Sequence, residues 1–297
     1  AKQSMNSDIR KLAILLVCSG YVVASFSGLI VRLLEVGPMV MNFYRALFLM
    51  CAVMILLAIR HRGAAVVRVI GVGWPGLLAG MMLAVTVITF IQSLTHTTVA
   101  NTLFVLGAIP FVTAALAWMF LSERPNSATL VTMAIAFGGI VIMIGEGFTI
   151  GSAYGNVMAL LATLCFAIYA VLVRRYRQID MLPAILISTF IIMAVVALMR
   201  QGELEISRQG LLLCLLWGGV MSGFTSAVFI FASRHVVAAE LTLFMLLEFA
   251  LGPVWVWLFI NEIPSRWTLV GGVLVISALV GRSLSEFRSP GLPGSSS

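Results

Sequence analysis

The sequence predicts an all-α membrane protein of ten transmembrane helices, arranged as two inverted five-helix repeats. Hydrophobic residues make up 61% of the 297 residues and charged residues only 10%, a composition too apolar for the interior of a water-soluble domain. The apolar runs reach about 20 residues, the length that an α-helix needs to cross a hydrocarbon core, and lack the alternation of barrel strands. The third observation is an internal repeat.

The repeat relates Gly80 to Val131 with Gly219 to Val270, at an offset of 139 positions without a gap. Composition alone does not explain the match, because it includes residue types that are scarce in this chain. Examples are His96/His235, Trp118/Trp257, Glu123/Glu262 and Pro125/Pro264. The chain is therefore interpreted as two copies of one unit.

We expect five helices in each unit, separated by charged residues, prolines or glycines. Those of the first unit are predicted at 12–34, 38–59, 69–94, 98–121 and 129–144, and those of the second at 153–173, 183–199, 211–233, 238–260 and 268–284. Because five is odd, each unit ends on the opposite side of the membrane from its start, so the second copy must be inverted. The predicted organisation is a cytoplasmic N-terminal segment (1–11), a first repeat (12–147), a second, inverted repeat (153–285) and a disordered tail (286–297).

The positive charges predict the orientation. A net charge of +7 would suggest nucleic-acid binding in a soluble protein, but here the arginines lie singly or in short clusters at the ends of apolar runs. With a cytoplasmic N-terminus, thirteen Lys and Arg fall on the inner side and four on the outer: Arg32, Arg200, Arg208 and Arg266. We therefore expect both termini to be cytoplasmic, a lipid bilayer as partner and no nucleic acid.

Besides Arg32 and Arg282, which the charge count assigns to the span ends, three charged residues lie within the predicted spans: Arg45, Glu240 and Glu248. An ionised side chain at membrane depth costs about 3 kcal/mol on insertion scales, so each is a candidate for function. Alternatives remain for two of them, because Arg45 could snorkel outward and Glu240 lies near the inner end of its helix. Glu248 is the hardest of the three to explain by a structural role.

A spacing of four residues places Glu240, Phe244, Glu248 and Gly252 on one face of the ninth predicted helix, which we expect to look into the centre of the bundle. Glu240 is the repeat equivalent of Asn101, at the opposite end of the bundle. The two residues would mark the two mouths of one pathway. The alternative, that both merely cap helix starts, stays open.

Prolines, aromatic residues and hydroxyl residues complete the candidate site. Pro110 and Pro253 are expected to kink the fourth and ninth predicted helices and serve as gating positions, although structural kinks are common in membrane helices. The residues expected to line a central cavity, with plain packing as the alternative, are Tyr21, Thr86, Phe90, Tyr169, Phe224, Thr225 and Phe229.

Other machinery is missing from the sequence. There is no GxxxxGK[ST] loop, HExxH pair or GxSxG turn, so we expect neither an intrinsic ATPase nor a hydrolase, and no catalytic residue, metal or cofactor.

Several stretches resemble the EamA type of the drug/metabolite transporter superfamily. They are residues 97–104 (TTVANTLF), 117–125 (AWMFLSERP), 238–240 (AAE), 261–264 (NEIP), 42–48 (NFYRALF) and 155–162 (GNVMALLA). The resemblance covers nearly the whole chain and implies a ten-helix exporter of metabolites or drugs, with its site between the two repeats. The aromatic-rich centre is similar to that of bacterial amino-acid exporters of the YddG type. Asn261-Glu262-Ile263 departs from the Gly-Glu-Arg type of turn usual in the family.

Together these observations predict a secondary exporter of small metabolites, most directly amino acids including aromatic ones, in the cytoplasmic membrane. Arg45 or Glu248 would meet the charged groups of the small-molecule substrate or a coupling proton. One alternative is a sugar-phosphate or nucleotide-sugar exchanger of the same superfamily, which would need several Lys or Arg in its cavity. A remote alternative is a membrane-embedded enzyme or receptor-like scaffold.

Overall fold

The computed structural model describes residues 2–34, 36–61, 71–97, 99–144, 153–201, 203–261 and 266–288. Over these residues the regular structure is entirely helical. The helices are α1 (Lys2–Ala24), α2 (Ser27–Leu33), α3 (Pro38–His61), α5 (Gly73–His96), α6 (Val99–Leu106), α7 (Ile109–Leu121), α8 (Ser127–Ile144), α9 (Ala153–Arg175), α10 (Leu182–Arg200), α11 (Arg208–Cys214), the π-helix η1 (Leu215–Ser222), α12 (Gly223–Ala232), α13 (Ala238–Phe244), α14 (Leu246–Ile260) and α15 (Arg266–Arg288).

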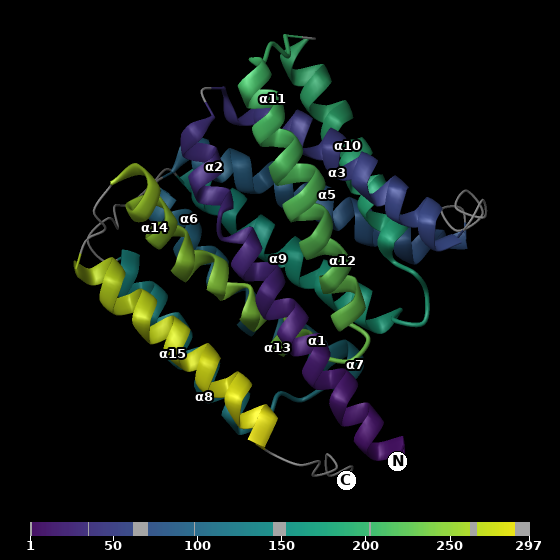
Figure 1. The fold of residues 1–297 in the computed structure, drawn as a ribbon, viewed down its shortest axis with the longest axis vertical. Coiled ribbons are helices and arrows are strands. Elements are labelled where there is room, and N and C mark those ends of the chain that lie inside the picture. The colour runs from purple at the N-terminus through teal and green to yellow at the C-terminus, as the bar shows by residue number, and fades with distance from the viewer. Residues whose placement is uncertain are drawn as a thin grey trace.

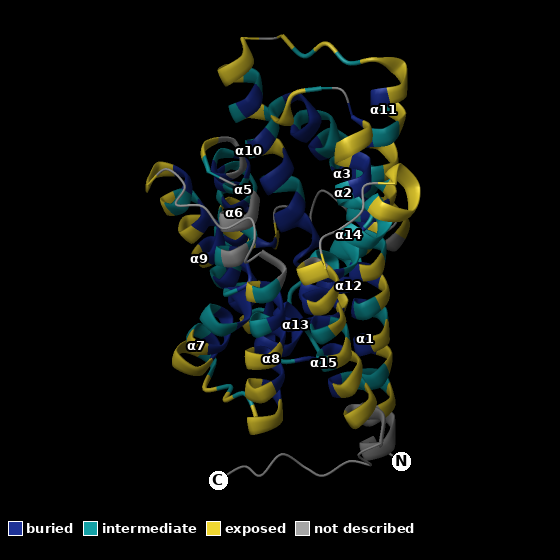
Figure 2. Cartoon of the chain, turned by 90° about the vertical axis from the view of Figure 1, so that its left-hand side faces the viewer, coloured by how far each residue is buried: buried dark blue, intermediate teal, exposed yellow. Residues whose placement is uncertain are grey.

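Seven helical stretches in the described part of the chain are long and apolar enough to cross a membrane. They are Asp8–Leu33, Pro38–Ile59, Gly73–Ser93, Ala153–Arg175, Leu182–Arg200, Arg208–Ala232 and Ala238–Ile260, and shorter apolar helices lie at Ile109–Leu121, Ser127–Ile142 and Leu269–Ser285. Large apolar residues such as Leu198 (80% exposed) and Ile59 (71%) are exposed, as expected of a surface that faces lipid. Figure 2 shows exposed residues along the outer sides of the helices. The prediction of an all-α membrane protein is confirmed.

Several predicted continuous spans are interrupted. The first span breaks at Ser25–Phe26, between α1 and α2, and the ninth at Met245, between α13 and α14. The fourth breaks at Gly107–Ala108, where Pro110 has no N–H to donate to the Leu106 carbonyl. By contrast, α14 continues through Pro253, so the kink expected there does not interrupt the helix.

Helix ends repeat between the two halves of the chain. Ser122 after α7 and Asn261 after α14 both adopt the left-handed conformation, with φ of 56° and 59°, and they are 139 positions apart. At the start of α8, Asn126 Oδ1 accepts a hydrogen bond from Thr129 N at 2.7 Å, as a helix-capping side chain does. At the chain ends, α1 already begins at Lys2 and α15 continues to Arg288, so helix extends into both segments that we expected to flank the fold.

The helices pack in pairs that join distant parts of the chain. α5 lies along α9, α8 along α15, α1 along α12, and α3 along both α10 and η1. α1 begins and α15 ends at the same end of the bundle, the lower end in Figure 1, whereas α2 and α11 lie towards the other end. Buried residues from α1, α9, α12 and α13 form the largest apolar core.

Candidate functional site

At the end of the bundle where α1 begins, Glu240 is held by two arginines. Its carboxylate accepts from Arg10 Nη2 of α1 at 2.9 Å, from Arg282 Nη2 of α15 and from Thr129 Oγ1 of α8 at 3.1 Å. Glu240 is only 4% exposed and Arg282 only 6%. We call Glu240, Arg10, Arg282 and Thr129 the Glu240 cluster. It ties α13 to α1, α8 and α15.

A second ion pair lies nearby in the fold. Arg174, near the end of α9, donates from Nε to Glu123 Oε1 at 2.8 Å and from Nη1 to the Ser233 carbonyl at 2.8 Å. Glu123 follows α7, so this pair links the ends of α7, α9 and α12. The distribution of charge along the sequence predicts the same side of the membrane for Arg10, Arg174 and Arg282.

Glu248 lies in a different environment, in the first turn of α14. Its Oε1 accepts from the Ser27 hydroxyl at 2.9 Å, and none of the described cations forms an ion pair with it. The side chain is partly exposed. Ser27 begins α2, immediately after the break at Ser25–Phe26, so the break places this hydroxyl opposite Glu248.

The same break is fixed by α14. Trp255 Nε1 donates to Ser25 Oγ at 2.7 Å, and the Trp255 ring stacks on Phe26 with a centroid distance of 4.2 Å and an interplanar angle of 16°. Ser25 in turn donates to the Val22 carbonyl at 2.6 Å, inside the preceding turn of α1. The position of Ser27 is therefore determined by packing between α14 and the interrupted first span.

Arg45 of α3 carries the positive charge of this region. Its Nε donates to Ser222 Oγ at 3.4 Å, its Nη1 donates to Asn42 Oδ1 at 3.5 Å, and its guanidinium lies 4.9 Å from the centroid of the Trp217 ring. Both hydrogen bonds are long, and no described carboxylate forms an ion pair with Arg45. The side chain is partly exposed, and Arg45 interacts electrostatically with Glu248.

Aromatic rings continue this region towards the core. Tyr169 of α9 and Phe229 of α12 stack with a centroid distance of 5.7 Å and an interplanar angle of 16°, and Phe166 meets both rings. Tyr21 of α1 interacts electrostatically with both Glu248 and Tyr169. Tyr21, Tyr169 and Phe229 are each about 5% exposed or less, so these candidates are packed core residues in this conformation.

The remaining candidates are dispersed. Thr86 bonds the Met82 carbonyl of its own helix at 2.8 Å, and Thr225 bonds the Gly20 carbonyl of α1 at 3.0 Å. Phe244 is 1% exposed, whereas Phe224 is 40% exposed. Phe90 packs against the core, and Pro110 is buried just after the break in the fourth span. The side chain of Asn101 lies outside the described residues.

The two glutamates of the ninth span lie on either side of the break at Met245, in different surroundings. Glu240 lies before the break and belongs to the Glu240 cluster, while Glu248 lies after it and meets Ser27. Both oxygens of Glu240 already accept hydrogen bonds, so in this conformation its carboxylate is not open to a ligand. The structure thus separates two glutamates that the spacing had grouped together.

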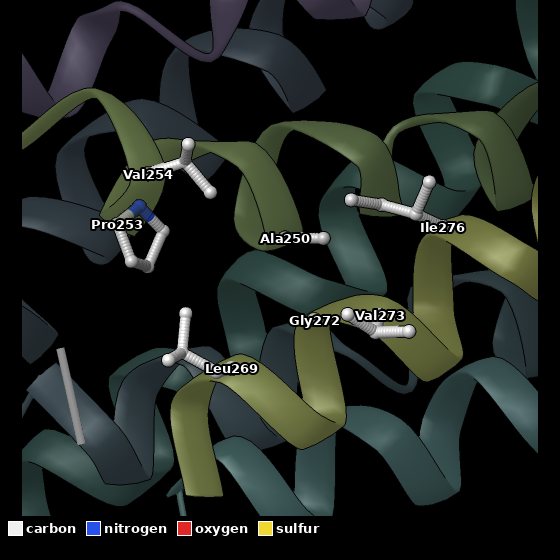
Figure 3. Close-up of a pocket in the computed structure, with 7 residues that line it drawn as sticks. All are labelled: Ala250, Pro253, Val254, Leu269, Gly272, Val273 and Ile276. Carbon is white, nitrogen blue, oxygen red and sulfur yellow. The ribbon is translucent and has the colours of Figure 1, made fainter. Parts of the chain in front are cut away.

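A small apolar cavity of about 60 Å³ lies between α14 and α15, and none of its lining residues is charged. It is lined by Ala250, Pro253, Val254, Leu269, Gly272, Val273 and Ile276 (Figure 3). Val273 is 64% exposed, so the cavity opens on the outer surface of the bundle. Pro253 therefore faces an apolar surface recess rather than the charged region.

The polar partners of the charged residues were not predicted from the sequence: Ser27, Ser222, Trp217, Thr129 and Asn42. A usable signal existed only for Trp217, which stands in the middle of its span and not at an end, where membrane tryptophans usually lie. In the described part of the chain, no group of three or more His, Cys, Asp or Glu residues is arranged to hold a metal.

Comparisons with known proteins agree with this architecture. The sequence model described as "EamA-like transporter family" matches residues 11–145 and again 153–284. The chain is 24% identical over 240 residues to the pseudopaline exporter CntI of Pseudomonas aeruginosa strains UCBPP-PA14 and PAO1, covering 78% of this chain and 82% of that protein. A crystal structure described only as "Crystal structure of protein" superposes with a TM-score of 0.81 at 16% identity, over 94% of this chain and 100% of that chain.

The two family matches together cover most of the chain, and the long apolar helices account for its place in the membrane. The resemblance found in the sequence is thereby confirmed at the level of the family. The chain is a multi-pass membrane protein that belongs to the EamA-like transporter family.

Proposed function

We propose that this protein is a secondary exporter of amino acids, including aromatic ones, which binds its substrate as a zwitterion between Arg45 and Glu248. One observation carries the proposal: a guanidinium and a carboxylate lie in the same region of the bundle, and neither forms an ion pair with a described residue. Ionised groups at membrane depth normally find partners, because leaving them unpaired is costly. An amino acid brings one carboxylate and one ammonium group, which complement these two charges.

The aromatic rings beside Glu248 favour a substrate with an apolar or aromatic side chain. Tyr21 interacts electrostatically with Glu248 and with Tyr169. The rings of Tyr169, Phe229 and Phe166 contact one another and continue the aromatic surface into the core. Aromatic pairs gain about 0.5–1.5 kcal/mol beyond the burial of their area, so such a surface discriminates in favour of aromatic ligands. A small rearrangement would have to expose these rings, which are closely packed in the present conformation.

Alternating access follows from the proposed architecture of ten spans in two inverted units. Three features support that architecture: the sequence repeat at an offset of 139 residues, the left-handed helix ends at Ser122 and Asn261, and the breaks in the fourth and ninth spans. In this proposal both termini are cytoplasmic, in agreement with the charge count, and the Glu240 cluster closes the cytoplasmic mouth. The name of the relative, pseudopaline exporter CntI, supports the export direction, and the proposal places the protein in the cytoplasmic membrane.

Glu248 is also the proposed proton site, since it is the acidic residue that the substrate ammonium would bind in place of the Ser27 hydroxyl. A sugar phosphate fits this region less well. In the described spans, Arg45 is the basic residue of the central region, and the buried Arg174 and Arg282 are already ion-paired elsewhere.

The test is uptake into proteoliposomes of a labelled panel of amino acids and sugar phosphates, with and without an imposed pH gradient. We expect amino acids to move, and Glu248→Gln to remove the dependence on the pH gradient. The matched control is Glu203→Gln, the same substitution at an exposed position between α10 and α11. Transport of sugar phosphates without amino acids would refute the substrate assignment.

A further inference from the structure

The π-helix η1 differs from its counterpart in the first half of the chain at one point of contact. In the first half, a Cβ on Gly80 of α5 would lie 2.6 Å from the Ala184 carbonyl oxygen of α10. In the second half, a Cβ on Gly218 of η1 would lie 2.2 Å from the Arg45 carbonyl oxygen of α3. Arg45 and Ala184 are repeat equivalents, but the equivalent of Gly80 is Gly219 rather than Gly218.

The same helix crossing therefore occurs twice, with a shift of one residue in the second copy. A π-helix closes each hydrogen bond one residue later than an α-helix, and π-helical turns are frequent at functional sites. The π-helical geometry of Leu215–Ser222 accounts for the shift, because α5 is continuously α-helical at the corresponding crossing. Gly219 itself has room, because a methyl group added to its Cα would have no neighbouring atom closer than 3.4 Å.

This register brings Trp217 and Ser222 to the Arg45 side chain. Ser222 Oγ accepts from Nε, and the Trp217 ring lies beside the guanidinium. The repeat-equivalent positions hold Leu78, Leu83 and Ala184, all apolar. The polar version of this crossing therefore exists in one half of the molecule only.

The remaining edge of the guanidinium is available to a ligand. Asn42 accepts from Nη1, whereas none of the described residues accepts a hydrogen bond from Nη2. The side chain is partly exposed, so this edge is not sealed inside the bundle. A guanidinium held at Nε and along its face can present two parallel donors to a planar oxyanion, the geometry that carboxylates prefer.

We infer that Trp217 and Ser222, brought into place by η1, are positioning residues that orient Arg45 as a binding subsite for the carboxylate of the substrate. The identity of the substrate rests on the proposed function. The carboxylate subsite itself is independent of the proposed function. Glu248 is likewise present in one half only, since its repeat equivalent is Ile109. Two unlike charges that each occur once fix a single orientation for a zwitterion.

Tryptophan fluorescence of the purified protein tests the subsite directly. We expect 3-phenylpropionate, which has a carboxylate and no ammonium, to change the fluorescence of the parent, and Trp217→Phe to abolish the change. Ser222→Ala should raise the half-saturating concentration about tenfold, the effect of losing about 1.4 kcal/mol of binding free energy. Ser226→Ala is the matched control, because Ser226 lies one turn after Ser222, on α12. This variant should keep the half-saturating concentration within about twofold of the parent value.

Uptake separates this inference from the proposed function. In proteoliposomes, Ser222→Ala and Trp217→Leu should raise the KM for phenylalanine about tenfold with Vmax nearly unchanged, and Trp217→Phe should restore part of the loss. If the parent transports no amino acid but the carboxylate response depends on Trp217 and Ser222, the proposed substrate fails and the subsite stands. If Ser222→Ala behaves like Ser226→Ala, or the response survives in Trp217→Phe, the subsite is overturned.

Discussion

Glu240 is the clearest case of a single residue whose role the structure redefines. Its spacing from Glu248 suggested a second ligand in the pathway, yet its carboxylate is bound by Arg10, Arg282 and Thr129. A buried ion pair contributes little net stability, but removal of one partner leaves an uncompensated charge. The Glu240 cluster is therefore expected to be sensitive to single substitutions and tolerant of paired ones.

Glu240→Gln should lower the free energy of unfolding by about 3–5 kcal/mol, because it removes the carboxylate that binds both Arg10 and the buried Arg282. Thermal unfolding in detergent measures this change. The double variant Glu240→Gln/Arg282→Met should recover a large part of the loss. Glu123→Gln serves as comparison, since Glu123 pairs with one arginine among the described residues and its side chain is 23% exposed, so a smaller loss is expected. Equal losses in both single variants would contradict this account of the cluster.

The candidate site was only partly predictable at the scale of residues. Arg45 and Glu248 could be found from the sequence because a charge inside an apolar run is costly and therefore rare. Ser27, Ser222 and Asn42 could not be found, because small polar residues are common in membrane helices and their partners come from distant segments. Tyr21, Tyr169 and Phe229 are buried, and their contact with a substrate stays a prediction; their close packing depends on tertiary contacts.

At the scale of elements, the sequence predicted where the apolar runs lie but not how they are interrupted. Pro110 marks the break at Gly107–Ala108, because a missing N–H is a local signal. The breaks at Ser25–Phe26 and Met245 contain neither proline nor glycine. At Ser25–Phe26 the conformation is fixed by Trp255 of α14, a contact across the fold that no local pattern encodes.

The π-helix η1 gives a prediction for two adjacent glycines. Gly218→Ala should destabilise the protein and reduce uptake, because its methyl group would collide with the Arg45 carbonyl oxygen. Gly219→Ala should be tolerated and stabilise by up to about 1 kcal/mol, the helix-propensity difference between the two residues. Thermal unfolding and uptake of both variants check this. If Gly219→Ala were the harmful variant and Gly218→Ala the tolerated one, the crossing would keep the α-helical register of the first half.

At the scale of the whole molecule, the Glu240 cluster joins elements from both halves of the chain. α8 belongs to the first half, α13 and α15 to the second, and α1 opens the chain. The repeat equivalents of Glu240 and Arg282 are Asn101 and Met143, which cannot form the same ion pair. Among the described residues, an ionic closure of this kind is therefore found at one end, and we expect the conformation closed at that end to be favoured without substrate.

Accessibility to a membrane-impermeant maleimide measures this closure. In a variant without the four native cysteines, Thr242→Cys should react slowly, because Thr242, two residues after Glu240 on α13, is fully buried. Adding Glu240→Gln should increase labelling several-fold from the side of the termini only. Thr189→Cys on α10, also buried, is the control for general loosening. Faster labelling at both positions, or from the opposite side, would contradict a closure specific to this end.

The proposal as a whole depends on recognition of both charges of the substrate. Counterflow of labelled phenylalanine in proteoliposomes tests this most directly, with unlabelled phenylalanine, 2-phenylethylamine and 3-phenylpropionate as competitors. Because Arg45 and Glu248 each lack an ionic partner among the described residues, we predict that phenylalanine competes at least about tenfold more strongly than either analogue. Equal competition by all three compounds, or no counterflow of phenylalanine, would contradict the assignment of Arg45 and Glu248 as the two ends of an amino-acid site.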